Sequence, residues 1–205
     1  MKNISTYITE KLRINSTKPT HSYKPNGYDE LKYITKDLIA ERGLDADLND
    51  IDTSMIIDMG YLFYNYNKFN GDISEWNVSN VTEMTCMFYG CNKFNSDLSK
   101  WDVSNVVDMT GMFLECSEFN SDISEWNVSK VKGMSSMFYS CKSFNQDISK
   151  WDVSNVTEMR YMFSGCENFS YDLSNWNVSN VKKMENIFYK CHALKTKPSW
   201  YKNKA

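Results

Sequence analysis

The chain has 205 residues, enough for one or two domains. Its 23 Lys and Arg residues face 26 Asp and Glu residues, and a net charge of −3 excludes the basic excess that nucleic-acid binders use. The two histidines, His21 and His192, lie near opposite ends, so histidine-based metal sites and general bases are not expected. No apolar run approaches the roughly 20 residues of a membrane span, and the start does not resemble a secretory signal. We therefore expect a protein that is cytoplasmic at synthesis, without membrane insertion and without a nucleic-acid partner.

Residues 1–46 are predicted to form a helical N-terminal arm and cap. Two short helices are expected, at 4–14 and at 28–42, and Gly43 is suited to end the second one. Four apolar residues give the second helix one apolar side: Leu31, Ile34, Leu38 and Ile39. Because a repeat stack needs an end cap to shield its first unit from water, we assign that role to the second helix.

A 25-residue repeat fills most of the remaining chain. Tryptophan recurs at Trp76, Trp101, Trp126, Trp151 and Trp176. Phenylalanine recurs at Phe88, Phe113, Phe138, Phe163 and Phe188, and cysteine at Cys91, Cys116, Cys141, Cys166 and Cys191. These series predict a six-rung solenoid over 47–196, in units of 47–71, 72–96, 97–121, 122–146, 147–171 and 172–196, followed by a basic C-terminal tail at 197–205.

Each rung shows two kinds of spacing. In 73–79, Trp76 and Val78 alternate with polar residues, which predicts a strand with one buried face. In 81–91 the apolar residues fall on one stripe of a short helix. The expected fold class is therefore an α/β repeat solenoid with one short parallel strand and one short helix per rung.

The repeated phrase D-[IL]-S-x-W-[ND]-V-S-[NK]-V-x-x-M-x-x-M-F-x-x-C-x-x-F-N resembles the BspA-like leucine-rich-repeat family of bacterial surface proteins, which also occurs in some phage proteins. The resemblance covers about 150 residues. It implies a leucine-rich-repeat-like solenoid with roles in adhesion and protein binding.

Two ladders allow more than one interpretation. The five repeated cysteines are expected to be buried free thiols, with disulfides and metal binding as alternatives, and Cys86 is expected to be the most reactive thiol. An unbroken acidic series is expected to cap the turns of its own rungs, with Ca²⁺ binding between rungs as the alternative. That series comprises Asp72, Asp97, Asp122, Asp147 and Asp172.

Two faces compete as the binding surface. On the expected strand face, charges alternate in sign at Glu75, Lys100, Glu125 and Lys150. This pattern favours a polar face whose side chains pair with those of neighbouring rungs. The alternative is a surface that binds a ligand. The expected helix face varies from rung to rung and carries tyrosines, which serve well as anchors. We therefore predict partner-binding residues there: Tyr89, Tyr139, Tyr161 and Tyr189.

The predicted function is non-enzymatic protein binding. No phosphate-binding, nucleophile or zinc-protease motif is found, and the carboxylates recur alike on every rung, so neither catalysis nor a cofactor is expected. One alternative is a structural component of a phage particle or an adhesin-like bacterial surface protein, which would be virion-associated if phage-encoded. Residues 47–181 hold 8 Lys+Arg and 19 Asp+Glu (net −11), whereas 182–205 hold 7 Lys and one Glu (net +6). End-to-end self-association is therefore a further alternative.

Overall fold

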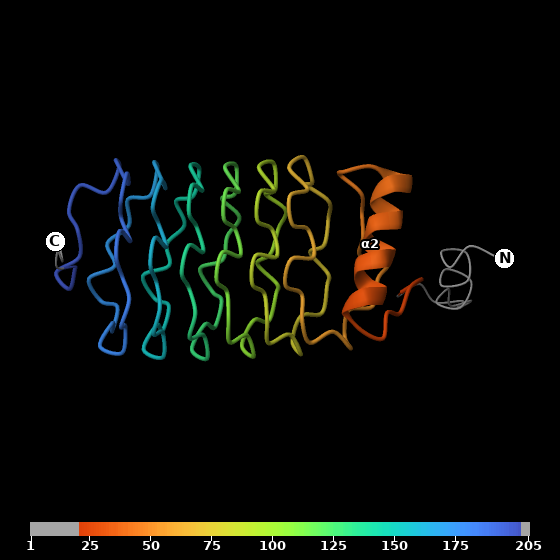
Figure 1. Ribbon diagram of the computed structural model, residues 1–205, viewed down its shortest axis with the longest axis horizontal. Helices are drawn as coiled ribbons and strands as arrows, with labels where there is room; N and C mark the ends of the chain where they lie inside the picture. Colours follow the sequence, from red (N-terminus) through yellow and green to blue (C-terminus); the bar gives the residue numbers. More distant parts are fainter. Residues whose placement is uncertain (1–20, 202–205) are drawn as a thin grey trace.

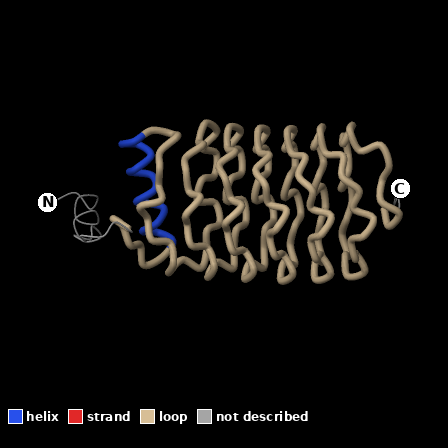
Figure 2. Tube along the Cα trace, turned by 180° about the vertical axis from the view of Figure 1, so that it is seen from behind, coloured by secondary structure: helices blue, strands red, loops and turns tan. Residues whose placement is uncertain are grey.

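The computed structural model describes residues 21–201. The chain winds into a row of stacked rungs, with one helix lying across the N-terminal end of the row (Figure 1). That helix, α2, spans Tyr28–Arg42. Seen from behind, the rungs are drawn as loop throughout (Figure 2), because the described residues form only isolated β-bridges between rungs. The predicted helix at 4–14 lies outside the described residues. No described helix is long and apolar enough to cross a membrane.

Helix α2 lies where the sequence places it and packs as an end cap. Its buried side is formed by Leu31, Ile34, Thr35, Leu38 and Ile39. The helix ends at Gly43, whose φ of 96° is accessible to glycine and whose N–H donates to the carbonyl of Ile39 at 2.9 Å. The guanidinium of Arg42 donates hydrogen bonds to both carboxylate oxygens of Asp50, at 3.0 and 2.9 Å. This bidentate ion pair joins the end of the helix to the first rung.

The segment predicted as a short helix in each rung is instead a run of two tight turns. In the second rung, Met87 N–H bonds to the carbonyl of Met84, and Cys91 N–H bonds to that of Phe88. The third residue of each turn, Cys86 (φ 52°) or Gly90 (φ 74°), is left-handed, which makes both turns type II. We call this segment the turn run; it covers 59–66, 84–91, 109–116, 134–141, 159–166 and 184–191.

Turn runs of neighbouring rungs are joined by a ladder of parallel hydrogen bonds. Every second N–H in a run donates to the next rung, as from Met84 to the carbonyl of Asp108 at 3.0 Å and from Phe88 to that of Met112 at 2.9 Å. The bridges follow the same register, from Asp58 through Glu83 to Asp108 and onward in steps of 25 residues. The sheet-like pairing therefore lies in the segment expected to be helical.

The segment predicted as a strand is also different. In 73–79 the chain turns, because Trp76 N–H bonds back to the carbonyl of Ile73 at 3.1 Å and Val81 N–H to that of Val78 at 2.9 Å. The alternation of Trp76 and Val78 with polar residues nevertheless places both side chains in the core. Period-2 burial is produced here by successive turns rather than by an extended strand.

Aromatic columns fill the interior. The phenylalanines of the turn runs, from Phe63 to Phe188, stack nearly parallel with successive ring centroids 5.5 to 5.8 Å apart. A second column runs from Phe69 to Phe169 at 5.9 to 6.2 Å. The repeated tryptophans are 3–4% exposed, and each indole N–H donates to a carbonyl of the preceding rung, as from Trp126 to Leu98 at 3.1 Å.

The described part of the tail extends the tryptophan column by one member. Trp200 stacks on Trp176 with ring centroids 6.5 Å apart and donates its indole N–H to the carbonyl of Leu173 at 2.7 Å. Tyr201 meets the edge of Phe188 at 5.5 Å. Trp200 is half-buried.

Candidate functional site

The outward side of the turn runs is the surface on which rungs differ most. Within a run, the Met, Phe and Cys side chains point into the core, whereas residues such as Thr85, Cys86 and Tyr89 are partly or fully exposed. We call this outward side, together with the two residues that precede each run, the turn face. It replaces the helix face predicted from the sequence, and it carries the tyrosines that were assigned there.

Two tyrosines of the turn face have strained backbone. Tyr61 (φ 58°) and Tyr161 (φ 56°) occupy the first left-handed position of their runs, where other rungs have Gly111 or Asn186. A left-handed residue with a bulky side chain costs about 1–2 kcal/mol. Both side chains are nonetheless 49% and 39% exposed, so burial does not offset that cost. Strain held at an exposed aromatic residue is a feature of functional positions.

The four tyrosines proposed from the sequence do not form one cluster. Tyr161 and Tyr189 are exposed, whereas Tyr89 and Tyr139 are half-buried between neighbouring rungs. Among residues 21–201, no ring contact joins any two of these four. Tyr89 instead meets Tyr64 of the first rung in an edge-on contact, with centroids 4.8 Å apart.

The first rung carries an apolar group that the sequence analysis did not single out. Met55, Ile57, Tyr61 and Tyr64 are 68%, 62%, 49% and 40% exposed, and the rings of the two tyrosines lie 5.8 Å apart. We call these four residues the first-rung patch. In later rungs the position of Met55 is taken by Asn80, Asn105, Lys130, Asn155 and Asn180. The sequence alone could have indicated this group, because the column of Met55 is polar in every other rung.

An acidic column lies beside this patch. Asp58, Glu83 and Asp108 occupy bridged positions of three successive rungs, and no Lys or Arg of residues 21–201 forms an ion pair with any of them. Partial burial, followed by the charges of Asp108 and Asp58, raises the pKa of the Glu83 carboxyl above its usual value. In later rungs the column is no longer an unpaired acidic series, because Gly133 follows Asp108 and Lys183 forms an ion pair with Glu158.

The repeated aspartates act within their own turns. Asp72 accepts the N–H of Ser74 at 2.9 Å, and the other four members accept the serine N–H two residues ahead in the same way. These serine hydrogen bonds lower the pKa of Asp72, Asp97, Asp147 and Asp172. Within residues 21–201, no group of three or more His, Cys, Asp and Glu residues is placed to hold a metal ion.

On the face that the sequence predicts to be polar, the alternating charges at 75, 100, 125 and 150 form one ion pair, between Lys100 and Glu75. Glu125 and Lys150 form no ion pair with any residue between 21 and 201. Other exposed pairs join adjacent rungs elsewhere, such as Lys142 with Glu167 at 3.1 Å. Each such surface pair contributes little to stability.

The cysteine column lies in the core. Each thiol approaches the carbonyl of a phenylalanine in the preceding rung, as Cys141 Sγ does that of Phe113 at 2.8 Å. Burial raises the pKa of Cys91 and of Cys191 to about 12, and that of Cys141 well above its usual value. No disulfide links the six cysteines, all of which lie within the described residues. Cys86 is half-buried on the turn face, next to Tyr61, and burial raises its pKa as well.

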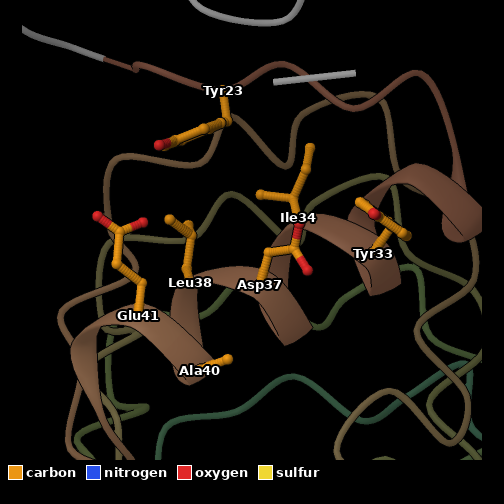
Figure 3. Close-up of a pocket in the computed structure, with 7 residues that line it drawn as sticks. All are labelled: Tyr23, Tyr33, Ile34, Asp37, Leu38, Ala40 and Glu41. Atoms are coloured by element: carbon orange, nitrogen blue, oxygen red, sulfur yellow. The ribbon is translucent and has the colours of Figure 1, made fainter. Parts of the chain in front are cut away.

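A separate cavity of about 420 Å³ lies against α2 (Figure 3). It is lined by Tyr23, Tyr33, Ile34, Asp37, Leu38, Ala40 and Glu41. Tyr23 belongs to a short segment that pairs with the first rung through a bridge to Ile51.

Stacked 25-residue rungs with a helical cap define a repeat-solenoid protein. Residues 34–138 and 116–205 match the model of the family described as Mycoplasma protein of unknown function, DUF285. These matches span most of the chain, which therefore belongs to this family. A comparison with curated proteins finds no match. The crystal structure of the T. pallidum leucine rich repeat protein (TpLRR) is similar over 68% of this chain and 72% of that one, with 15% sequence identity and a TM-score of 0.37.

Proposed function

We propose that the protein is a non-enzymatic binding module that recognises a protein partner through its turn face. The observation that carries the proposal is the pair of tyrosines Tyr61 and Tyr161, which are exposed on left-handed backbone. Their position costs free energy in the folded chain and gains no core packing in return. Contact with a partner would bury these rings, and the free energy gained from that burial would offset the backbone cost.

The rest of the turn face supports the same proposal. Tyr89, Tyr139 and Tyr189 share one column of it, and Tyr64 begins that column in the first rung. Tyrosine supplies a large contact area with little loss of side-chain entropy, and an apolar group such as the first-rung patch is typical of protein-binding surfaces. The resemblance of the repeated phrase to BspA-like leucine-rich-repeat proteins implies protein binding too.

The test compares two double variants in affinity capture of a partner. Replacing Tyr61 and Tyr161 by glycine removes both rings from positions that glycine suits, so the variant is expected to fold at least as stably as the wild type. We expect it to lose the captured partner. Glu125→Ser with Lys150→Ser, on the segments that follow Asp122 and Asp147, is the matched control and should retain it.

The opposite pattern contradicts the proposal. If the tyrosine variant captures the partner as the wild type does and the Glu125/Lys150 variant does not, binding belongs to the other face. Circular dichroism and melting temperature establish that both variants are folded.

A further inference from the structure

We propose that residues 4–14 of this chain bind as an amphipathic helix in the cavity against α2 and so add a second layer to the N-terminal cap. These residues lie outside the described part of the structure, and the proposal rests on the cavity and on the amino-acid sequence of the segment. It is independent of the proposed binding function, because the cavity is lined by α2 and Tyr23 and not by the turn face.

The first observation is the size and lining of the cavity. Its volume of about 420 Å³ falls within the range of roughly 300–1,000 Å³ that is typical of cavities that bind other molecules. Ile34 and Leu38 supply apolar surface from α2, and Tyr23 contributes a ring from the segment before the helix (Figure 3). The cavity is therefore suited to receive apolar side chains.

The second observation is the charge of the lining. Asp37 and Glu41 lie one helical turn apart on α2, and both line the cavity. No Lys, Arg or His is among the described residues that line it. An occupant that matches this cavity should combine apolar side chains with a positive charge.

The third observation is that the start of the chain has this composition. Residues 1–20 contain four basic residues and one acidic residue, a net charge of +3. In a helix over 4–14, one face would carry Ile4, Tyr7, Ile8 and Leu12. Lys11 would lie among these apolar residues, and Arg13 would lie on the opposite side of the helix. The segment thus offers one cation within an apolar stripe, and the cavity offers two carboxylates within a partly apolar lining.

The fourth observation is where the segment joins the described structure. Ser22 N–H donates to the carbonyl of Asp50 at 2.7 Å, and the next residue, Tyr23, already lines the cavity. Residues 15–20 can span about 20 Å when extended, and a helix over 4–14 would be about 16 Å long, shorter than the 15-residue α2. The segment can therefore reach the cavity, and the short connection keeps it at a high effective concentration there.

Packing against the cavity would also stabilise the segment as a helix. Isolated helices of fewer than about 12–15 residues are marginally stable in water. A helix over 4–14 therefore needs a surface that covers its apolar face. The cavity supplies such a surface from within the same chain.

The experiment measures amide hydrogen exchange of residues 4–14 in the full chain by mass spectrometry. In the wild type we expect exchange at least tenfold slower than that of an unstructured chain. Ala40→Trp places a large ring at the cavity and should return exchange to the unstructured rate. Lys32→Trp is the matched control, because Lys32 is exposed on α2 and does not line the cavity. Both substituted positions are exposed, so both variants should fold.

A second set of variants tests the charge. Lys11→Glu should raise the exchange rate of residues 4–14 at least tenfold, because it places an acidic group beside Asp37 and Glu41. Arg13→Glu, on the opposite side of the predicted helix, should raise it less than threefold. Adding Glu41→Lys to Lys11→Glu should slow exchange again by at least threefold.

Four results would overturn the proposal. The first is exchange of residues 4–14 at the unstructured rate in the wild type. The second is slow exchange that persists in both Ala40→Trp and Lys11→Glu, which would place the segment elsewhere, for instance on the first-rung patch. The third is an equal effect of Arg13→Glu and Lys11→Glu. The fourth is protection that is lost on dilution, which would assign the cavity to residues 4–14 of a second copy.

Discussion

At the scale of single residues, the least expected feature is the left-handed pair of positions in every turn run. Glycine or asparagine occupies several of them, including Gly90, Gly111 and Asn186, as the backbone conformation favours. Tyrosine, cysteine, serine, glutamate and lysine occupy the others. The chain therefore holds unfavourable residues at positions where a better one is already present elsewhere in its own repeat.

Replacing Tyr161 by glycine is expected to stabilise the fold by about 1 kcal/mol, because the substitution relieves the left-handed strain at a side chain that lies outside the core. Urea unfolding measures the change. Tyr189→Gly serves as the control, since Tyr189 is exposed on ordinary backbone and glycine there should give no gain. Stabilisation of the same size in both variants would show that the strain is not its source.

The six thiols should react in an order set by burial. Cys86 should be modified first by a bulky thiol reagent, although its raised pKa makes it slower than a free cysteine at pH 8. Cys116, Cys141 and Cys166 should react only after unfolding, because they are fully buried. Mass spectrometry of partly labelled protein gives the order. Early labelling of Cys141 would mean that the core opens readily.

At the scale of elements, the sequence predicted the contents of each rung better than its conformation. The buried columns of Trp, Met, Phe and Cys were visible as periodic residues, and α2 was visible from its apolar side and Gly43. The turn run was not. Its spacing of apolar residues fits a helix equally well, and the bonds that decide between them reach the next rung. A glycine or asparagine at one of the two left-handed positions, as at Asn65, Gly90 and Gly111, was the available signal against a helix.

The candidate site was predictable to a similar extent. Variable positions and tyrosines indicated the side of the rung that the structure places on the outside of the turn runs, because variation between repeats is read directly from the sequence. The left-handed backbone at Tyr61 was not predictable, since it depends on backbone geometry. Met55 was readable in principle, as an apolar exception in a polar column.

Removing a tryptophan from the middle of the stack should cost far more than removing the last one. Trp126→Ala leaves a cavity between two complete rungs and removes the indole N–H that donates to the carbonyl of Leu98. We therefore expect the free energy of unfolding to fall by about 3–5 kcal/mol. Trp200→Ala removes a half-buried ring with one neighbouring rung and should cost much less. Chemical denaturation compares the two. Similar losses would contradict the difference in packing.

At the scale of the whole molecule, stability should fall in acid. Asp72, Asp97, Asp147 and Asp172 have lowered pKa values in the fold, so their contribution is complete above the unfolded pKa of about 4 and is lost as the pH falls through the folded values. Glu83 acts in the opposite direction, because partial burial, followed by the charges of Asp108 and Asp58, raises its pKa and disfavours its charged form. We expect the melting temperature to be highest near pH 5 and to fall steeply below pH 4. A melting temperature that stays level down to pH 2 would contradict the role of these caps.

The constant offset between contacting residues has a consequence for how such proteins change over generations. Every rung bonds to its neighbours through pairs of residues separated by 23 to 28 positions, and many of these pairs are chemically alike along the stack. A duplication of one 25-residue unit in the gene would therefore insert a rung whose two surfaces already match those it separates. The number of rungs can therefore change by whole units while the core columns and the cap formed by α2 stay as they are.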